Sequence, residues 1–359
     1  MHRRQQGFTI IELVIAIAVT LIMMTAAMMV YQRSVQVAGV VGTRAEMQSE
    51  LRAATEQIAR DLNQAGTGLQ GISIAIPSAA TGGADPFLAC DATPKCYLPG
   101  AKLSSGVLYA ITPEDGIGPN TTELTDAIVI LYVEPVSNDP SDRNASGTAP
   151  NWAAFTTTNI SDDGSVITMP PGTTPPLDDP VVGIVLGDMF LVQNSNAAVG
   201  IVTTYDATAN TITFGTGDPL NINQLSAPVG NIAALKSGSP PAYAAVALHR
   251  IDMITYFIQE VDTPNGPDYR LMRQVDARTP TPVAEHIEDL QFTYDVFDPT
   301  TDTVTVNLPD AAGKPGEIKK VNITITARSS RPNTQGIYDR LTLTTSVGPQ
   351  NLSYHEKYN

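Results

Sequence analysis

The chain has few charged residues for its length. Asp, Glu, Lys and Arg make up 16% of its 359 residues, whereas roughly 25% is typical of globular domains. Basic residues are the scarcer kind, with 21 Lys and Arg against 36 Asp and Glu, and the net charge is −15. Such a chain has little general attraction for nucleic-acid phosphates or anionic lipid headgroups, so we expect no nucleic acid among its partners.

Cysteine and histidine are scarce as well. Two Cys residues are too few for a four-cysteine zinc site or for a small fold held together by disulfides. The four His residues form no H-E-x-x-H pattern, and neither G-x-S-x-G nor a P-loop occurs. We therefore assign no catalytic residue, no metal ligand and no cofactor, and we expect that the chain is not an enzyme.

One long apolar run lies near the N-terminus. From Phe8 to Val30 the only charged residue in 23 is Glu12. A helix of this length spans roughly 34 Å, enough to cross the hydrocarbon core of a bilayer. Because Arg3 and Arg4 precede the run, the positive-inside rule puts the N-terminus in the cytoplasm. The acidic remainder of the chain is then exported.

Two ordinary explanations fit this run poorly. A cleavable secretory signal has an apolar region of about 7–15 residues, which is shorter than the run here. A plain membrane anchor explains the length, yet a carboxylate one turn inside the span costs about 2.5–3.5 kcal/mol on insertion scales. Glu12 is therefore a candidate functional residue with a cationic partner, since a buried carboxylate is tolerated when it meets a cation.

The residues Gly7-Phe-Thr-Ile-Ile-Glu12-Leu-Val-Ile, with the short basic leader before them, resemble the class III signal of type IV prepilins and pseudopilins. The resemblance implies that residues 1–7 are a leader peptide, which a prepilin peptidase removes by cutting between Gly7 and Phe8. It also implies N-methylation of the new Phe8 amine. Glu12 would then pair with the Phe8 amine of a neighbouring subunit in the filament.

The helical pattern continues beyond the apolar run. No Pro occurs between Phe8 and Pro77, and Gly66 and Gly68 supply natural helix stops. We therefore expect one helix from Phe8 to about Ala65.

This helix divides into two halves. Residues 8–30 form the transmembrane or filament-core half, and residues 31–65 form an amphipathic continuation. The run Arg60-Asp-Leu-Asn-Gln-Ala-Gly66 resembles the end of this helix in PilW-type minor pilins, which are related to J-type pseudopilins of type II secretion. Apolar residues recur on one face of the second half, at Met47, Leu51, Ala54, Ile58 and Leu62.

After Gly66 the hydrophobic period changes to the two-residue alternation of strands with one wet face. The sequence therefore predicts an α+β fold, in which the long N-terminal helix packs on a mostly antiparallel β head, residues 66–359. The expected strands are Val107–Ile111, Ala127–Val133, Val181–Val192, Val199–Tyr205, Thr211–Phe214, Ala245–Ile258, Tyr269–Val275, Leu290–Phe297, Val321–Ala327 and Leu341–Val347.

Two features interrupt the head. Residues 134–180 hold eight prolines with many Asn, Asp, Ser and Gly, which predicts a loop-rich insertion, either a variable decoration or a functional surface loop. Cys90 and Cys96 lie in a Pro-rich connection. In an exported head the oxidising compartment favours a local disulfide between them, and a free reactive pair is the alternative.

The leading hypothesis is a structural minor pilin, similar to the PilW type, that joins a tip complex priming type IV pilus assembly. Its implied partners are the prepilin peptidase, other minor pilins, the major pilin, the inner-membrane assembly platform and, through the N-terminal helix, the membrane. It would cross the inner membrane once, with the head in the periplasm, before it enters the filament at the cell surface. The alternatives are a pseudopilin of type II secretion and a pilus-tip adhesin that acts through the loop-rich head.

Overall fold

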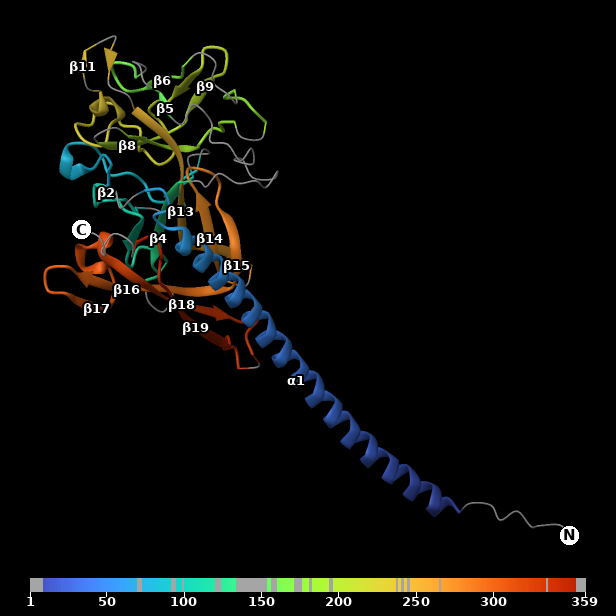
Figure 1. Cartoon of the computed structure of the whole chain (residues 1–359). Coiled ribbons are helices and arrows are strands. Elements are labelled where there is room, and N and C mark those ends of the chain that lie inside the picture. The colour runs from blue at the N-terminus through green and yellow to red at the C-terminus, as the bar shows by residue number, and fades with distance from the viewer. Residues whose placement is uncertain are drawn as a thin grey trace.

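One helix carries the chain from its N-terminal segment into a β-rich head (Figure 1). The computed structural model describes residues 9–69, 73–91, 95–98, 100–119, 124–133, 154–155, 160–170, 176–180, 183–193, 196–236, 238–239, 242–243, 246–264, 266–333 and 335–352. Helix α1 (Ile10–Gln64) is continuous over 55 residues, which is about 83 Å. The predicted single helix is confirmed.

Two glycines end α1 and turn the chain into the head. Gly66 and Gly68 have φ angles of +77° and +72°, a region that glycine adopts without steric cost. The Gly66 amide donates a hydrogen bond to the Leu131 carbonyl at 2.9 Å, and the Val133 amide donates to the Thr67 carbonyl at 2.8 Å. The end of the helix is thereby tied to a central strand of the head.

The largest sheet is built around β13 (Val246–Thr263), a strand of 18 residues. Its C-terminal half pairs with β14 (Gly266–Val275), its middle pairs with β4 (Ala127–Val133), and its N-terminal part pairs with β7 (Met189–Gln193). Every described pair in this sheet is antiparallel. The remaining strands are β3 (Ile111–Glu114) beside β4, β15 (Thr281–Glu285) beside β14, β8 (Ala197–Ile201) beside β7, and β5 (Ala154–Phe155) beside β13.

A second sheet has four antiparallel strands in the order β17-β16-β18-β19. The strands are β16 (Ile287–Asp298), β17 (Thr303–Leu308), β18 (Ile318–Arg328) and β19 (Arg340–Val347). The predicted alternation is confirmed in its two central strands: on β16 the side chains of Leu290, Phe292, Tyr294 and Val296 are buried, and on β18 those of Val321, Ile323, Ile325 and Ala327 are buried.

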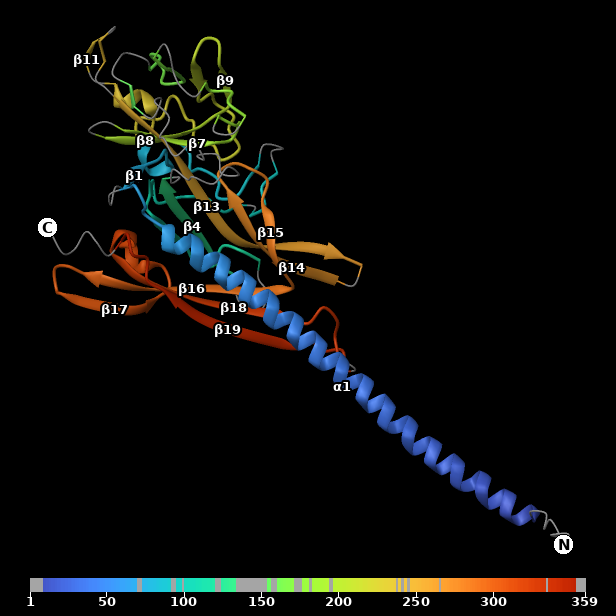
Figure 2. The ribbon, with the colours of Figure 1, turned by 45° about the vertical axis from the view of Figure 1, so that its right-hand side comes forward.

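The stretch of α1 from Met47 to Leu62 lies between these two sheets, whereas residues 31–42 of the predicted amphipathic half are exposed (Figure 2). One hydrophobic core joins the helix to one face of β4, β13 and β14 and to the inner face of β16 and β18. The opposite face of the large sheet is covered by residues 69–110 in a second core, so the central strand β4 is buried on both faces. The helix contributes to the first core the five residues that the sequence predicts: Met47, Leu51, Ala54, Ile58 and Leu62.

A distal lobe sits at the end of the head farthest from the start of α1 (Figure 1). It has its own hydrophobic core, which includes Ile167, Phe190 and Phe214. The described part of the predicted insertion at 134–180 adds β5 to the large sheet and contributes the strand β6 (Val166–Thr168) and buried side chains such as Leu177 to this lobe. The remaining short elements of the head are β1 (Ile74–Ala75), β2 (Val107–Leu108), β6 (Val166–Thr168), β9 (Thr204–Asp206), β10 (Thr211–Thr213), β11 (Gly238–Ser239), β12 (Ala242–Tyr243), and the 3₁₀ turns Ala79–Thr81, Ile232–Leu235, Ala311–Gly313 and Pro315–Glu317.

Some strand predictions differ from the structure. The strand expected over Val181–Val192 begins only at Met189, because the Asp188 carboxylate accepts a hydrogen bond from the Val185 amide and holds that segment in a turn. The strands β15 and β17 were not predicted. Both are edge strands, which lack the buried alternation that marks β16 and β18.

Gly68 tests the junction between helix and head. A Cβ atom there would lie 2.7 Å from the Val133 Cβ atom, at a φ that L-residues rarely adopt. We therefore expect Gly68→Ala to lower the free energy of unfolding of the head by about 1–3 kcal/mol. The measurement is denaturant unfolding of the full chain in detergent. Gly42→Ala is the control, since nothing lies within 4 Å of its Cβ position; an equal loss in both variants would contradict this reading.

Candidate functional site

The N-terminal start of α1 is closed by reciprocal hydrogen bonds. Gly7 and Phe8, the predicted cleavage and methylation residues, lie outside the described residues. Thr9 is the N-cap of α1, and Glu12 completes a capping box with it. The Glu12 Oε2 atom accepts hydrogen bonds from the Thr9 amide at 3.0 Å and from the Thr9 hydroxyl at 2.9 Å, while the Glu12 amide donates to the Thr9 hydroxyl at 3.4 Å.

This cap gives Glu12 a local role that the sequence analysis missed. The Thr9 amide and hydroxyl both donate to one carboxylate oxygen of Glu12. The cap therefore gives hydrogen-bond partners to the amides of Thr9 and Glu12, which have none within the helix. The T-x-x-E spacing from Thr9 to Glu12 is the signal that could have found it. The carboxylate is thus held beside the Thr9 nitrogen, one residue from the amine that a cut after Gly7 would create.

The first half of α1 is exposed along its whole described length. Large apolar side chains from Ile10 to Val41 are exposed, and this helix is long and apolar enough to cross a membrane, with a mean hydropathy of 2.6 in its most apolar window. An apolar surface of this size is not stable in water, so it requires lipid or apolar surfaces of other chains around it. This half of the helix is therefore suited to burial in an apolar environment.

The second half of α1 carries a buried charge. Asp61 is 3% exposed, and its Oδ2 atom accepts a hydrogen bond from Arg273 Nε at 2.7 Å and from the Tyr256 hydroxyl at 2.6 Å. Arg273 lies on β14 and Tyr256 on β13. A buried carboxylate with two such partners holds the helix in one register against the sheet, because sliding or rotation would leave the charge unpaired.

Sequence reasoning placed Asp61 inside the run that resembles PilW-type helices but assigned it no role. It follows Arg60 and precedes Leu62, so it borders the apolar face whose residues are Ile58 and Leu62. A carboxylate next to the buried face is the signal that could have found it, since charged residues are almost never fully buried unless they are paired.

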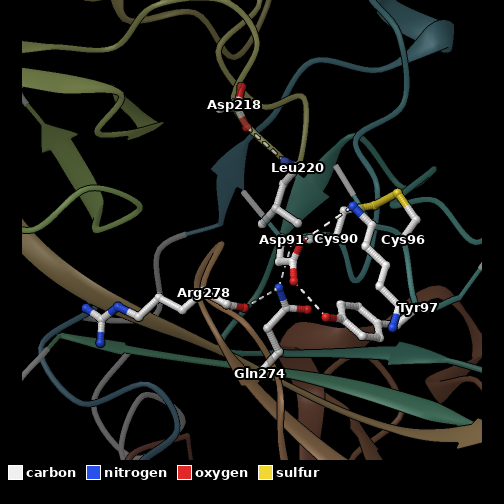
Figure 3. Close-up of a disulfide and its surroundings, with 9 residues drawn as sticks. Cys90, Asp91, Cys96, Tyr97, Asp218, Leu220, Gln274 and Arg278 are labelled. Carbon is white, nitrogen blue, oxygen red and sulfur yellow. Dashed lines mark hydrogen bonds between the residues drawn. A yellow bond between two sulfur atoms is a disulfide. The ribbon is translucent and has the colours of Figure 1, made fainter. Parts of the chain in front are cut away.

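The disulfide loop rests on the other side of the large sheet (Figure 3). The structure joins Cys90 and Cys96, with 2.01 Å between the sulfur atoms. The buried Gln274 of β14 donates to the Cys90 carbonyl at 2.7 Å, and the Tyr97 hydroxyl donates to the Asp91 carboxylate at 2.6 Å. Burial and the neighbouring Asp91 raise the pKa of Tyr97 to about 12, so this hydroxyl stays a donor at neutral pH.

A second set of buried charges joins the distal lobe to the large sheet. Asp188, at the start of β7, is fully buried and lies 2.6 Å from Arg278 and 3.5 Å from Arg250. Arg250 also donates to the Gly183 carbonyl at 2.9 Å. Nearby, complete burial raises the pKa of Asp276, whose carboxylate accepts a hydrogen bond from the Met253 amide at 2.8 Å. These contacts are internal supports of the head.

Two hollows lie on the described surface. A cavity of about 220 Å³ sits where α1 leaves the head and is lined by Glu46, Glu50, Glu285, His286 and Arg328 among others. A larger one, about 460 Å³, lies on the distal lobe and is lined mostly by small and amide side chains. Within the described residues, no group of three or more His, Cys, Asp or Glu side chains is arranged to hold a metal ion.

Comparison with known families identifies the N-terminal segment. A family model described as the prokaryotic N-terminal methylation motif matches residues 2–28. No curated protein and no solved structure matches the chain. The motif supports a type IV pilin-like or pseudopilin protein, a generally non-enzymatic class, and implies processing by a prepilin peptidase and assembly with other pilins. The matched residues include most of the apolar half of α1, and the match does not extend into the head.

The ion pair between Asp61 and Arg273 generates a first test. Asp61→Ala leaves Arg273 without its partner and Tyr256 without its acceptor, and breaking a buried pair on one side costs about 3–5 kcal/mol. The double variant Asp61→Ala/Arg273→Ala should recover part of this loss in denaturant unfolding of the full chain. As a matched control, Glu56→Ala removes a carboxylate from the exposed side of the same helix. Additive losses with no coupling would show that the pair does not hold the helix.

The disulfide generates a second test. Closing a short loop stabilises a fold by about 2 kcal/mol in the chain-entropy treatment, so Cys90→Ser/Cys96→Ser should lose about that much in unfolding free energy. Mass analysis of alkylated protein from the exported fraction, without reductant, should find no free thiol. Two alkylated cysteines in that sample would show that the pair is free in the cell.

Proposed function

We propose that the chain is a minor pilin of PilW type, which joins a tip complex that primes type IV pilus assembly. The observation that carries the proposal is the division of α1 into two halves. One half is wholly exposed, apolar and capped by Glu12, and the other is buried in the head and clamped through Asp61. A chain built this way presents a rigid apolar rod to other subunits and keeps a folded head beside it.

The proposed course begins in the inner membrane. The leader, residues 1–7, is removed between Gly7 and Phe8 by the prepilin peptidase, and the Phe8 amine is methylated. The N-terminus faces the cytoplasm and the head lies in the periplasm, as Arg3 and Arg4 favour. The partners are other minor pilins, the major pilin and the assembly platform, and the final location is the filament at the cell surface.

Assembly exchanges lipid for helix contacts around the same apolar surface. The side chains from Ile10 to Val30 leave the bilayer and pack against helices of neighbouring subunits, so little apolar area is exposed to water at any stage. Glu12 would be costly in that environment without a cation, and the Phe8 amine of a neighbour supplies one. The cap made by Thr9 holds the carboxylate at the helix start, where this contact forms.

Two alternatives use the same N-terminal segment. A pseudopilin of type II secretion carries the same kind of signal, so the motif match supports it equally. The head of this chain is larger than is usual in such pseudopilins, and this difference favours a pilus. An adhesin at the pilus tip is supported by the position of the distal lobe, which lies at the far end of the head from α1's start and bears the cavity of about 460 Å³ (Figure 1).

Glu12 tests the proposed assembly role. Glu12→Ala should reduce the amount of the chain in sheared filaments at least about tenfold, because the methylated amine loses its counter-charge. Mass analysis of the N-terminus should still find cleavage after Gly7. Thr25→Ala is the control, since its hydroxyl bonds only the Leu21 carbonyl of its own helix. Normal incorporation of the Glu12 variant would overturn the proposed mechanism.

A further inference from the structure

The two sheets of the head differ in the residues that their edge strands carry. An edge strand presents unpaired amides and carbonyls, and proteins usually block such edges with Pro or charged residues. Two edge strands of the large sheet are blocked in this way: β3 carries Pro113 and Glu114, and β15 carries Pro282 and Glu285. The four-stranded sheet has no such protection along its outer strand β17, whose sequence is Thr303-Val-Thr-Val-Asn-Leu308.

The side chains of β17 are open on both faces. The first five residues of the strand are exposed, with Val304 and Val306 exposed by 52% and 58%. The β16–β17 hairpin projects from the head on the side away from α1 (Figures 1 and 2). An uncharged, β-branched edge strand of this kind is a template for another strand. Left uncovered, it is a liability for an exported protein.

The opposite edge of the same sheet, strand β19, has a sequence and direction suited to pairing with a strand like β17. Strand β19 is Arg340-Leu-Thr-Leu-Thr-Thr-Ser-Val347; after its first residue, Arg340, it contains no charge, and it has no proline. Within the described residues, β19 pairs on one side only, with β18. Each step across the sheet is antiparallel, so β19 runs antiparallel to β17. A second head of this layout, set beside the first in the same orientation, therefore brings an antiparallel partner strand to β17.

Pilin-type assembly produces that orientation. The methylation motif implies assembly with other pilins, and chains inserted through the same helix all point the same way. We propose that β17 is the docking strand for the outer edge strand of the neighbouring pilin-type subunit's head, which joins the two sheets by backbone hydrogen bonds. This inference rests on the proposed function and adds a contact between heads to the contact between helices.

The occupant is defined by chemistry. It is an extended, uncharged segment rich in Thr, Val or Leu, presented by a chain whose own N-terminal helix lies parallel to α1. Backbone hydrogen bonds give affinity in strand addition, and side-chain pairs across the junction give selectivity. The exposed Thr342 and Thr344 of β19, which contact Thr326 and Thr324 of β18 across the sheet, are an example of the side chains expected on the partner.

Photo-crosslinking of the full chain in its own cells tests the contact. A benzophenone side chain at Val306 should form an adduct in assembled material with a subunit that itself carries an N-terminal methylation motif, at a residue in its head. The same side chain at Val185, 49% exposed on another part of the head, should not. No adduct at Val306, or an adduct only with a protein that lacks the motif, would overturn the proposal.

Charge at the edge supplies the second measurement. Val304→Lys/Val306→Lys places two charges on β17 without filling the core, and it should lower the chain's incorporation into sheared filaments about tenfold. The control Val185→Lys/Ile337→Lys adds the same charges at residues of similar exposure and should change incorporation less than about twofold. Equal effects of the two pairs would count against β17.

The unsubstituted chain separates the two hypotheses. If it is absent from filaments, the proposed function fails. If it is present while Val306 forms no adduct and the β17 lysines have no effect, the head contact alone fails.

Discussion

The burial of one face of α1 between two sheets is the constraint on which the rest of the structure depends. The helix supplies Met47, Leu51, Ala54, Ile58 and Leu62 to a core shared by both sheets. Without the helix, the inner faces of the two sheets would have no common partner. A long apolar helix in a membrane can rotate and slide, but a helix whose second half is a core element cannot. The head therefore fixes the direction in which the exposed half points.

Charge sharpens this constraint. Hydrophobic packing alone tolerates small shifts along a helix, because leucine and isoleucine side chains are similar in shape and polarity. Asp61 does not tolerate them, since a displacement would separate its carboxylate from Arg273 and Tyr256 in a buried site. The Asp188 contacts do the same for the distal lobe. Asp61 and Asp188 thus lie where parts of the molecule join, and there an unpaired buried charge is costly.

The proposed assembly uses both ends of this rod. At the N-terminal end, the Thr9 and Glu12 cap presents a carboxylate beside the first residues of the helix. At the head, the edge strand β17 carries no proline or charge and lies on the side away from α1 (Figures 1 and 2). Helix contacts are apolar and have little directional preference, whereas strand pairing is directional. A contact between heads would therefore supply the register that helix packing leaves loose.

The sequence by itself determined the long helix, the position of its buried face and the antiparallel character of the head. Each of these follows from local periodicity: apolar steps of three and four mark the buried face of α1, and alternation marks β16 and β18. The N-terminal signal was equally local, because the basic leader, Gly7, Phe8 and Glu12 lie within a few residues of each other.

Only the tertiary structure decided that β4 is buried on both faces, that β13 links the large sheet to the distal lobe, and that Asp61 meets Arg273. Asp61 is separated from Arg273 and Tyr256 by about two hundred residues of sequence. The edge strands β15 and β17 lack the buried alternation by which a strand is predicted. Which residues meet across such distances depends on how the layers pack, and no local pattern encodes that.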